Sequence, residues 1–440
     1  MKYWIHAAKQ LINTWRSNIG IFVELILVLG VAWYMVDYFF VQLYNRCLPA
    51  GRSFDDTYVL RVASLPESDP AYQVAEADSA AVEANLRRVV ERVKAYPGVQ
   101  VVGISYDCGS QPYSPCYMEN GFINMQDTSR TASMAMIYNI DPREDFFGVF
   151  RHVSAVDGHA VRMEEFDWTD PHAIVITRRV EQQLMGDDVP AGASVGLKVR
   201  SSWSDSDNYY LVKGVLQDVK RLDDRLPEGY AFQPSNGAGQ ELAERYISFR
   251  IDPAVAGAGF AERFELEMGR QLRIGNCYLY DVRSYEQIRR DTELLFGTTY
   301  AWNIRLSLLI FLGLNILLCV MGSFWYRVRQ RRGEIGLRMA MGSSRRGVWS
   351  QLMREGICIL ALATPVALFI EMHLAMIGLV DLPYGDTPAG YLPAIGPLRF
   401  LLTNLMAWLL VAAVICLAVW LPASRAAQED PAVALRHGDE

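Results

Sequence analysis

The residues of this chain whose types could do chemistry are mostly arginines in one segment, and they do not form a catalytic pattern. The segment 327–354, RVRQRRGEIGLRMAMGSSRRGVWSQLMR, holds eight arginines and a single acid, Glu334. No G-x-S-x-G, H-E-x-x-H or paired-carboxylate pattern stands out, and the six histidines are scattered. We therefore expect no catalytic residues and no metal site. The basic segment is suited to ionic contacts, either with lipid headgroups or with a partner protein.

Two acids lie in strongly apolar sequence and are candidates for intramembrane contacts. Glu24 interrupts the apolar segment 19–43, where a charged side chain at the centre of a span costs about 2.5–3.5 kcal/mol. We expect Glu24 to make a helix–helix or interface contact; a substrate or proton role and contact with headgroups are the alternatives. Glu371 and His373 lie two residues apart, so they do not share a helix face and no metal site is expected there.

The elements that must position these residues begin with four apolar segments. The chain has 440 residues, of which 51% are hydrophobic, and a membrane span needs about 20 mostly apolar residues. We divide the chain into a cytoplasmic amphipathic helix (1–18), transmembrane helix 1 (19–43), an outer domain (44–300), transmembrane helix 2 (301–326), a cytoplasmic coupling loop (327–355), transmembrane helix 3 (356–380), an outer loop (381–399), transmembrane helix 4 (400–421) and a cytoplasmic tail (422–440).

The orientation follows from the basic residues that flank these spans. Lys and Arg occur before the first span, throughout the 327–355 loop and in the tail, and such residues mark the cytoplasmic side. The long segment between the first two spans is then outside the cytoplasm. Residues 40–326 hold 28 Lys and Arg against 38 Asp and Glu, so nothing in this region favours nucleic-acid binding.

Four of the seven cysteines fall in the outer region, where disulfides can persist. Cys108 and Cys116 bracket the turn-rich loop GSQPYSP, and we predict a disulfide between them; two free thiols are the alternative. No histidine stands near them at the spacing of metal ligands.

The outer region alternates strand and helix patterns. A strand at 57–64, a helix at 78–95 and a strand at 99–106 form one βαβ unit, and the segments 246–251, 259–272 and 276–281 form a second. The sequence between them is β-rich, with a hairpin of 194–200 and 209–219. The fold class we expect is an α+β membrane protein: four transmembrane helices, with a large extracytoplasmic α/β domain of split βαβ units and a β-rich insertion between helices 1 and 2.

Two motifs resemble a known transporter family. The segment GEIGLRMAMG at 333–342 and the tail PASRAA at 422–427, followed by Asp430-Pro431 and Ala434-Leu435-Arg436, resemble FtsX-like/MacB-type ABC transporter permeases. Val156-Asp157-Gly158, HAIVIT at 172–177 and Pro190-Ala191-Gly192 are similar to the MacB-like periplasmic core domain of that family.

The resemblance implies a permease subunit in a bacterial inner membrane, crossing it several times. In the family the 333–342 region contacts an ATPase, and this role carries over to Glu334, Gly336, Arg338, Ala340 and Gly342. The chain has no G-x-x-x-x-G-K-[ST] loop, so we expect ATP and Mg²⁺ to be bound by a separate cytoplasmic ABC ATPase and no cofactor by this chain.

The implied activity is mechanotransmission, in which ATP hydrolysis by the partner moves the periplasmic domain for efflux or for lipoprotein or peptide export. The alternative is an FtsX-like regulatory or signalling subunit that gates an extracytoplasmic partner without moving cargo. Further partners that the resemblance allows are a second permease, as homodimer or heterodimer, a periplasmic adaptor protein and membrane lipids.

Overall fold

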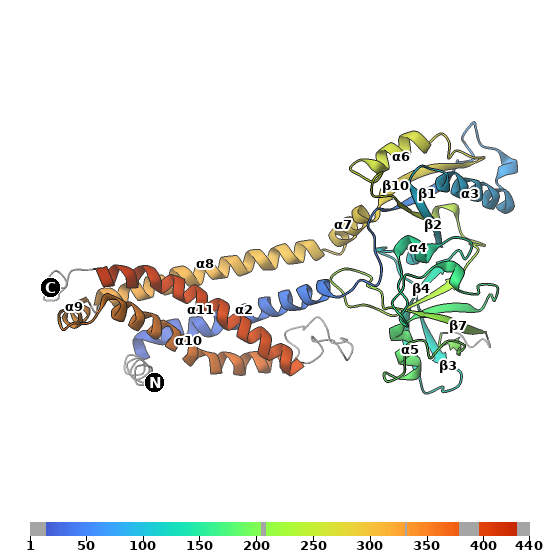
Figure 1. The fold of residues 1–440 in the computed structure, drawn as a ribbon. Coiled ribbons are helices and arrows are strands. Elements are labelled where there is room, and N and C mark those ends of the chain that lie inside the picture. The colour runs from blue at the N-terminus through green and yellow to red at the C-terminus, as the bar shows by residue number, and fades with distance from the viewer. Residues whose placement is uncertain (1–14, 204–207, 331, 378–395, 429–440) are drawn as a thin grey trace. The chain divides into compact units, whose positions relative to one another are not determined.

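The computed structural model describes residues 15–203, 208–330, 332–377 and 396–428. It divides into two compact units: an α/β domain, Asn45–Thr298, and a helical unit made by the described residues on either side of it (Figure 1). Among the described residues, four helices are long and apolar enough to cross a membrane. The expected fold class, four such helices with a large α/β domain between the first two, is confirmed.

The helical unit consists of four long helices packed side by side and one short helix at their end (Figure 1). Leu25, Trp33, Ile359 and Leu360 are among the buried side chains that form its common apolar core. The most apolar part of the second long helix is only 11% buried, against 33–39% in the other three, so this helix offers the most surface to lipid or to another chain. The helices are α2 (Trp15–Cys47), α8 (Thr298–Gln330), α9 (Arg332–Ala340), α10 (Arg345–Met376) and α11 (Gly396–Gln428).

Several helix boundaries differ from those expected. The 327–355 segment is not an open loop, because α8 continues to Gln330, α9 follows and α10 begins at Arg345. Arg399, assigned to the outer loop, lies in the first turn of α11. Most of the expected amphipathic helix 1–18, most of the outer loop 381–399 and the end of the tail lie outside the described residues.

The α/β domain begins and ends with two interleaved βαβ units. The strand order β10-β1-β9-β2 places a strand of each unit between the two strands of the other, and all neighbours are antiparallel. The predicted split arrangement is thereby confirmed. Leu86, Val89, Val90 and Val93 on one face of α3 are fully buried against this sheet, as the helical spacing predicted. The elements are β1 (Thr57–Ser64), α3 (Ser79–Lys94), β2 (Val99–Tyr106), β9 (Arg245–Ile251), α6 (Phe260–Met268) and β10 (Cys277–Ser284).

The insertion is a closed ring of six strands, which the sequence did not predict. Its order is β4-β3-β6-β7-β5-β8, and a parallel pairing of β8 with β4 closes the ring. The predicted hairpin is present as β6 paired with β7. The elements are β3 (Glu119–Asn124), β4 (Thr131–Ile140), β5 (Ala173–Thr177), α5 (Arg178–Met185), β6 (Lys198–Ser201), β7 (Tyr209–Leu216) and β8 (Tyr230–Pro234); α4 (Phe146–Phe150) and α7 (Tyr285–Leu295) complete the domain.

Candidate functional site

The short helix α9 contains most of the residues expected to dock an ATPase. Glu334, Gly336, Arg338 and Ala340 all lie in it, and Gly342 follows it directly. Gly342 adopts a φ of 96°, in the left-handed region that favours glycine, and its N–H donates to the Met339 carbonyl at 3.0 Å. This glycine therefore ends the helix and turns the chain toward α10.

Helix α9 has an inner and an outer apolar face. Ile335 and Met339 pack against the core of the helical unit. Leu337 and Met341, four residues apart on the opposite side, are 50% and 72% exposed. The next helix starts at a defined point, because the Ser344 hydroxyl accepts a hydrogen bond from the Gly347 N–H at 3.2 Å. The basic segment thus presents an anchored helix with two exposed apolar side chains.

Glu24 makes a contact between two membrane-spanning helices. It is half-buried on α2, and the Cys319 thiol of α8 donates to its carboxylate at 2.9 Å. The structure thus places Glu24 on a helix–helix contact, the arrangement expected for it. Among the interactions that the structure describes, neither a cation nor a third polar group contacts Glu24 and Cys319.

A buried ion pair between α2 and α11 was missed by the sequence reasoning. Arg399 donates to both carboxylate oxygens of Asp37, with 2.8 Å from its Nε, and both side chains are 6% exposed. Trp33, one turn earlier on α2, donates to the Thr403 hydroxyl of α11 at 3.1 Å. In the sequence, Asp37 lies in one apolar segment and Arg399 at the edge of another, and nothing in the pattern indicates that the two side chains pair.

Glu371 on α10 is 1% exposed, and neither of its carboxylate oxygens has a hydrogen-bond partner in the part of the chain that the structure describes. It lies against α2, where a Cβ built on Gly30 would be 4.0 Å from one of these oxygens. His373 points elsewhere and contacts Phe369.

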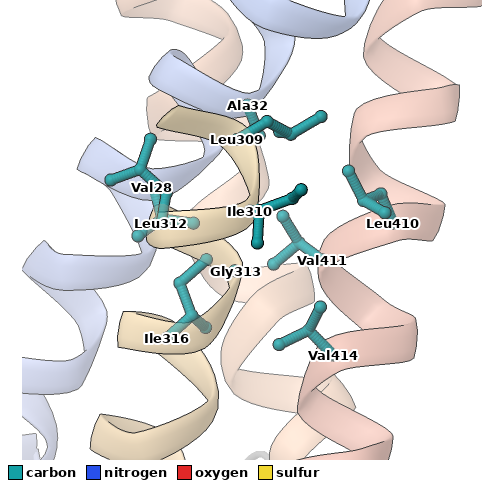
Figure 2. A pocket seen from close by; sticks show the side chains of 10 residues that line it. All are labelled: Val28, Ala32, Leu309, Ile310, Leu312, Gly313, Ile316, Leu410, Val411 and Val414. Atoms are coloured by element: carbon teal, nitrogen blue, oxygen red, sulfur yellow. The ribbon is translucent and has the colours of Figure 1, made fainter. Parts of the chain in front are cut away.

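An apolar cavity of about 250 Å³ lies between α2, α8 and α11 (Figure 2). Its walls are aliphatic side chains together with Gly313, so it offers no group that could orient a polar ligand. Ten residues line it: Val28, Ala32, Leu309, Ile310, Leu312, Gly313, Ile316, Leu410, Val411 and Val414.

Polar groups of the α/β domain form hydrogen bonds with the last turn of α2. The Lys220 ammonium donates to the backbone carbonyls of Asn45 and Leu48, the second at 2.6 Å. The Asn45 side chain donates to the Asp224 carbonyl at 2.9 Å, and Arg52 donates to the Lys220 carbonyl at 2.8 Å. Carbonyls at a helix C-terminus lack partners within the helix, and a lysine is a favourable cap for them.

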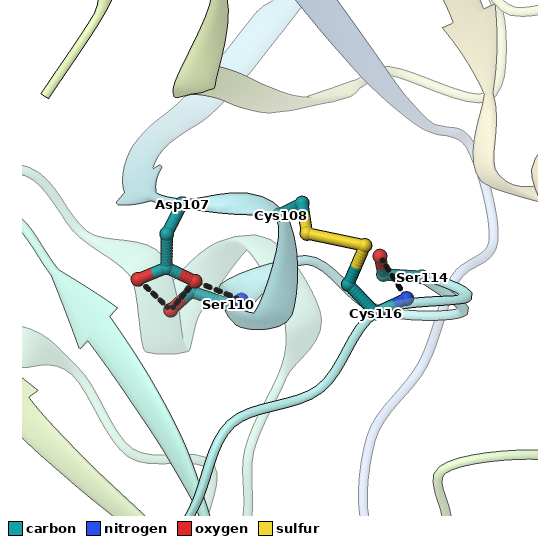
Figure 3. Close-up of a disulfide and its surroundings, with 5 residues drawn as sticks. All are labelled: Asp107, Cys108, Ser110, Ser114 and Cys116. Atoms are coloured by element: carbon teal, nitrogen blue, oxygen red, sulfur yellow. Dashed lines mark hydrogen bonds between the residues drawn. A yellow bond between two sulfur atoms is a disulfide. The ribbon is translucent and has the colours of Figure 1, made fainter.

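The structure contains a disulfide between Cys108 and Cys116, the two cysteines that the loop composition singled out (Figure 3). Asp107 accepts from the Ser110 N–H at 2.9 Å, and Ser114 accepts from the Cys116 N–H at 3.2 Å. These bonds fix the turns on either side of the bridge. Its presence in the cellular protein stays a prediction, which peptide mapping without reduction would test.

Perturbed titratable groups in the α/β domain belong to its core. His152 is completely buried among phenylalanines, and this burial lowers its pKa to about 3. Burial also raises the pKa of Cys277 to about 11. No group of three or more His, Cys, Asp or Glu side chains that could hold a metal occurs among the described residues. His152 and Cys277 are therefore parts of the packed interior, and burial makes the Cys277 thiol a poor nucleophile.

Comparison with known proteins identifies the C-terminal part of the chain. Among the solved structures that resemble the chain is a domain of a protein described as a permease from Porphyromonas gingivalis. It is 14% identical, the match covers 53% of this chain and 90% of that one, and the TM-score is 0.33. Another is the periplasmic region of MacB from Actinobacillus actinomycetemcomitans, which is 11% identical, with 55% of this chain and 94% of that one covered and a TM-score of 0.32. Both scores are too low to add to the fold described above. No curated protein matches the chain.

The family model for the FtsX-like permease C-terminal domain matches residues 306–431. This range contains most of α8, all of α9 and α10, and all described residues of α11. The comparison thus confirms the resemblance seen in the sequence for residues 306–431, which match this permease family model.

Proposed function

We propose that this chain is the permease subunit of an ABC transporter in a bacterial inner membrane, and that a separate cytoplasmic ATPase binds it at α9. The observation that carries the proposal is the exposed pair of Leu337 in α9 and Met341 directly after it, between two long apolar helices in the part matched by the permease model. Exposed apolar side chains in an arginine-rich segment of the sequence suit a groove with an apolar floor and an acidic rim.

The proposed activity is the transmission of ATP-driven movement to the α/β domain outside the membrane, for efflux or for lipoprotein or peptide export. Helix α2 is continuous from Trp15 to Cys47, and its last turn is capped by Lys220. A displacement of α2 along its axis would then act directly on the segment that contains Lys220 and Asp224. Figure 1 shows α7 leading into α8, the second connection between the α/β domain and the helices.

The test is reconstitution with the ATPase encoded next to this chain. The pure chain should hydrolyse no ATP, whereas the complex should hydrolyse ATP and release or export a substrate. Hydrolysis by the pure chain that a point mutation within it abolishes would contradict the proposal. Hydrolysis by the complex with no substrate moved, together with activation of an extracytoplasmic enzyme, would support the regulatory alternative.

A further inference from the structure

A cavity on the α/β domain has an unusual concentration of positive charge. The cavity has a volume of about 200 Å³, and Arg151, Arg162 and Arg250 are three of the eight residues that line it. The domain as a whole is acidic, with 27 Lys and Arg against 38 Asp and Glu over residues 45–298. Three guanidinium groups around one small cavity are therefore a local exception. We call this cavity the arginine pocket.

Arg250 is a buried cation whose hydrogen bonds go to uncharged groups. It is 3% exposed and donates to the carbonyls of Val149, Asp55 and Ser53 at 2.8, 2.7 and 2.9 Å. A guanidinium has five N–H groups, so two remain for another acceptor. Burial, and then the nearby charge of Arg151, lower the pKa of Arg250 to about 10. An anion in the pocket would relieve both penalties.

The other two arginines keep donors available. Arg151 is exposed and ends α4 with a left-handed φ of 50°, where its backbone N–H donates to the Phe147 carbonyl. Its side chain makes no hydrogen bond or ion pair with any residue that the structure describes. Arg162 donates one N–H to Asp145 at 3.0 Å, so its other guanidinium N–H groups remain available to an anion. Asp145 pairs with Arg162, and the charges of Asp55 and Asp56 partly offset that of Arg250. Arg151 has no ion-pair partner among the described residues, so its guanidinium is the one left for an anion.

We propose that the arginine pocket binds a compact anionic group, a phosphate or a carboxylate. Guanidinium forks match the planar or tetrahedral oxygen arrangements of these groups and hold them by paired hydrogen bonds. Val101, Ala160 and Val161 supply an apolar wall, so the anion can carry a short apolar neighbour. The ligand is either a free anion or an anionic group on a larger molecule handled by this domain. The proposal does not depend on the proposed transport function.

The test is calorimetric titration of the purified full chain with inorganic phosphate and, separately, with sodium acetate, at constant ionic strength set by chloride. We expect saturable binding of at least one of them to the wild type. Each of Arg151→Gln and Arg162→Gln should weaken it at least tenfold, since each removes charge-assisted hydrogen bonds to the anion. The matched control, Arg130→Gln, removes an exposed arginine paired with Asp127 elsewhere in the domain and should bind normally.

The source of the anion is distinguished by a second arm. Tight binding of phosphate or acetate alone indicates a free small anion. Alternatively, the chain binds both anions weakly and binds short-chain phosphatidic acid or an acylated amino acid at least tenfold more tightly. If this tighter binding still requires Arg151, the natural ligand is an anionic group on a larger molecule. No saturable binding of any of these probes, or equal binding by the Arg151→Gln/Arg162→Gln double variant, would overturn the proposal. Arg151→Gln without ligand should unfold at no lower temperature than the wild type, because it removes a repulsion.

Discussion

At the scale of single residues, the helical unit depends on the buried ion pair of Asp37 and Arg399. Arg399→Leu should lower the free energy of unfolding by about 3–5 kcal/mol, because it leaves the Asp37 carboxylate buried without a partner. The double variant Asp37→Leu/Arg399→Leu should recover most of this loss, since two apolar side chains replace two compensated charges. Unfolding in a titration with denaturing detergent measures both changes.

The control for this prediction is Glu24→Gln, which alters another acid of α2 whose described partner is the neutral thiol of Cys319. Its effect should stay below about 1 kcal/mol. An Arg399→Leu variant as stable as Glu24→Gln would show that the ion pair does not stabilise the packing of α2 against α11.

His152 makes the stability of the α/β domain depend on pH. Its pKa in the folded chain is about 3, below the unfolded value near 6.5, so protonation favours unfolding. The stability that the neutral ring contributes is complete above pH 6.5 and is lost as the pH falls toward 3. Between pH 7 and pH 5 this loss amounts to about 2 kcal/mol, from one proton taken up on unfolding.

The variant His152→Phe should remove this part of the pH dependence, because a phenyl ring suits the surrounding phenylalanines and does not titrate. Chemical unfolding of the wild type and the variant at pH 7 and pH 5 measures the difference. Parallel pH profiles for the wild type and His152→Phe would refute this assignment.

At the scale of elements, the cap on α2 is the contact best placed to pass movement into the α/β domain. Lys220→Met keeps the length of the side chain but removes the donors to Asn45 and Leu48. We expect transport to fall at least tenfold while ATP hydrolysis and ATPase binding persist, because the end of α2 loses two of its hydrogen bonds to the domain and, of those described here, keeps only that of Asn45 with Asp224. Transport assays and ATPase assays on the same reconstituted sample separate the two effects.

Lys213→Met is the corresponding control, since Lys213 forms an ion pair with Asp167 near the surface of the ring of strands. It should leave transport unchanged. Normal transport by Lys220→Met would show that the cap only stabilises the junction.

The elements that the sequence predicted well are those set by local pattern. Strands 57–64 and 99–106 have the predicted boundaries, because the strand pattern ends there at turn residues. Closure of the ring by β4 and β8 could not be predicted, since it pairs residues about 90 positions apart. The Asp37–Arg399 and Arg151–Arg250 juxtapositions are likewise products of tertiary packing.

At the scale of the whole molecule, the proposed function requires the helical unit, the α/β domain and a separate partner that supplies ATP to work together. The permease family model matches residues 306–431, and the α/β domain is connected to the helices by α2 and by the α7–α8 segment. Helix α9 is the point at which an ATPase would have to bind for hydrolysis to move the other elements. The account therefore depends most on α9.

The most direct measurement is co-purification of the ATPase with α9 variants at normal membrane abundance. Leu337→Asp should abolish it by placing a charge in an apolar contact, and Gly336→Leu and Glu334→Lys should weaken it through bulk and reversed charge. Leu266→Asp, which changes a still more exposed leucine on α6, is the control and should bind the ATPase fully. Full ATPase binding and full transport by all three α9 variants would contradict the account and leave the basic segment with a role in membrane orientation alone.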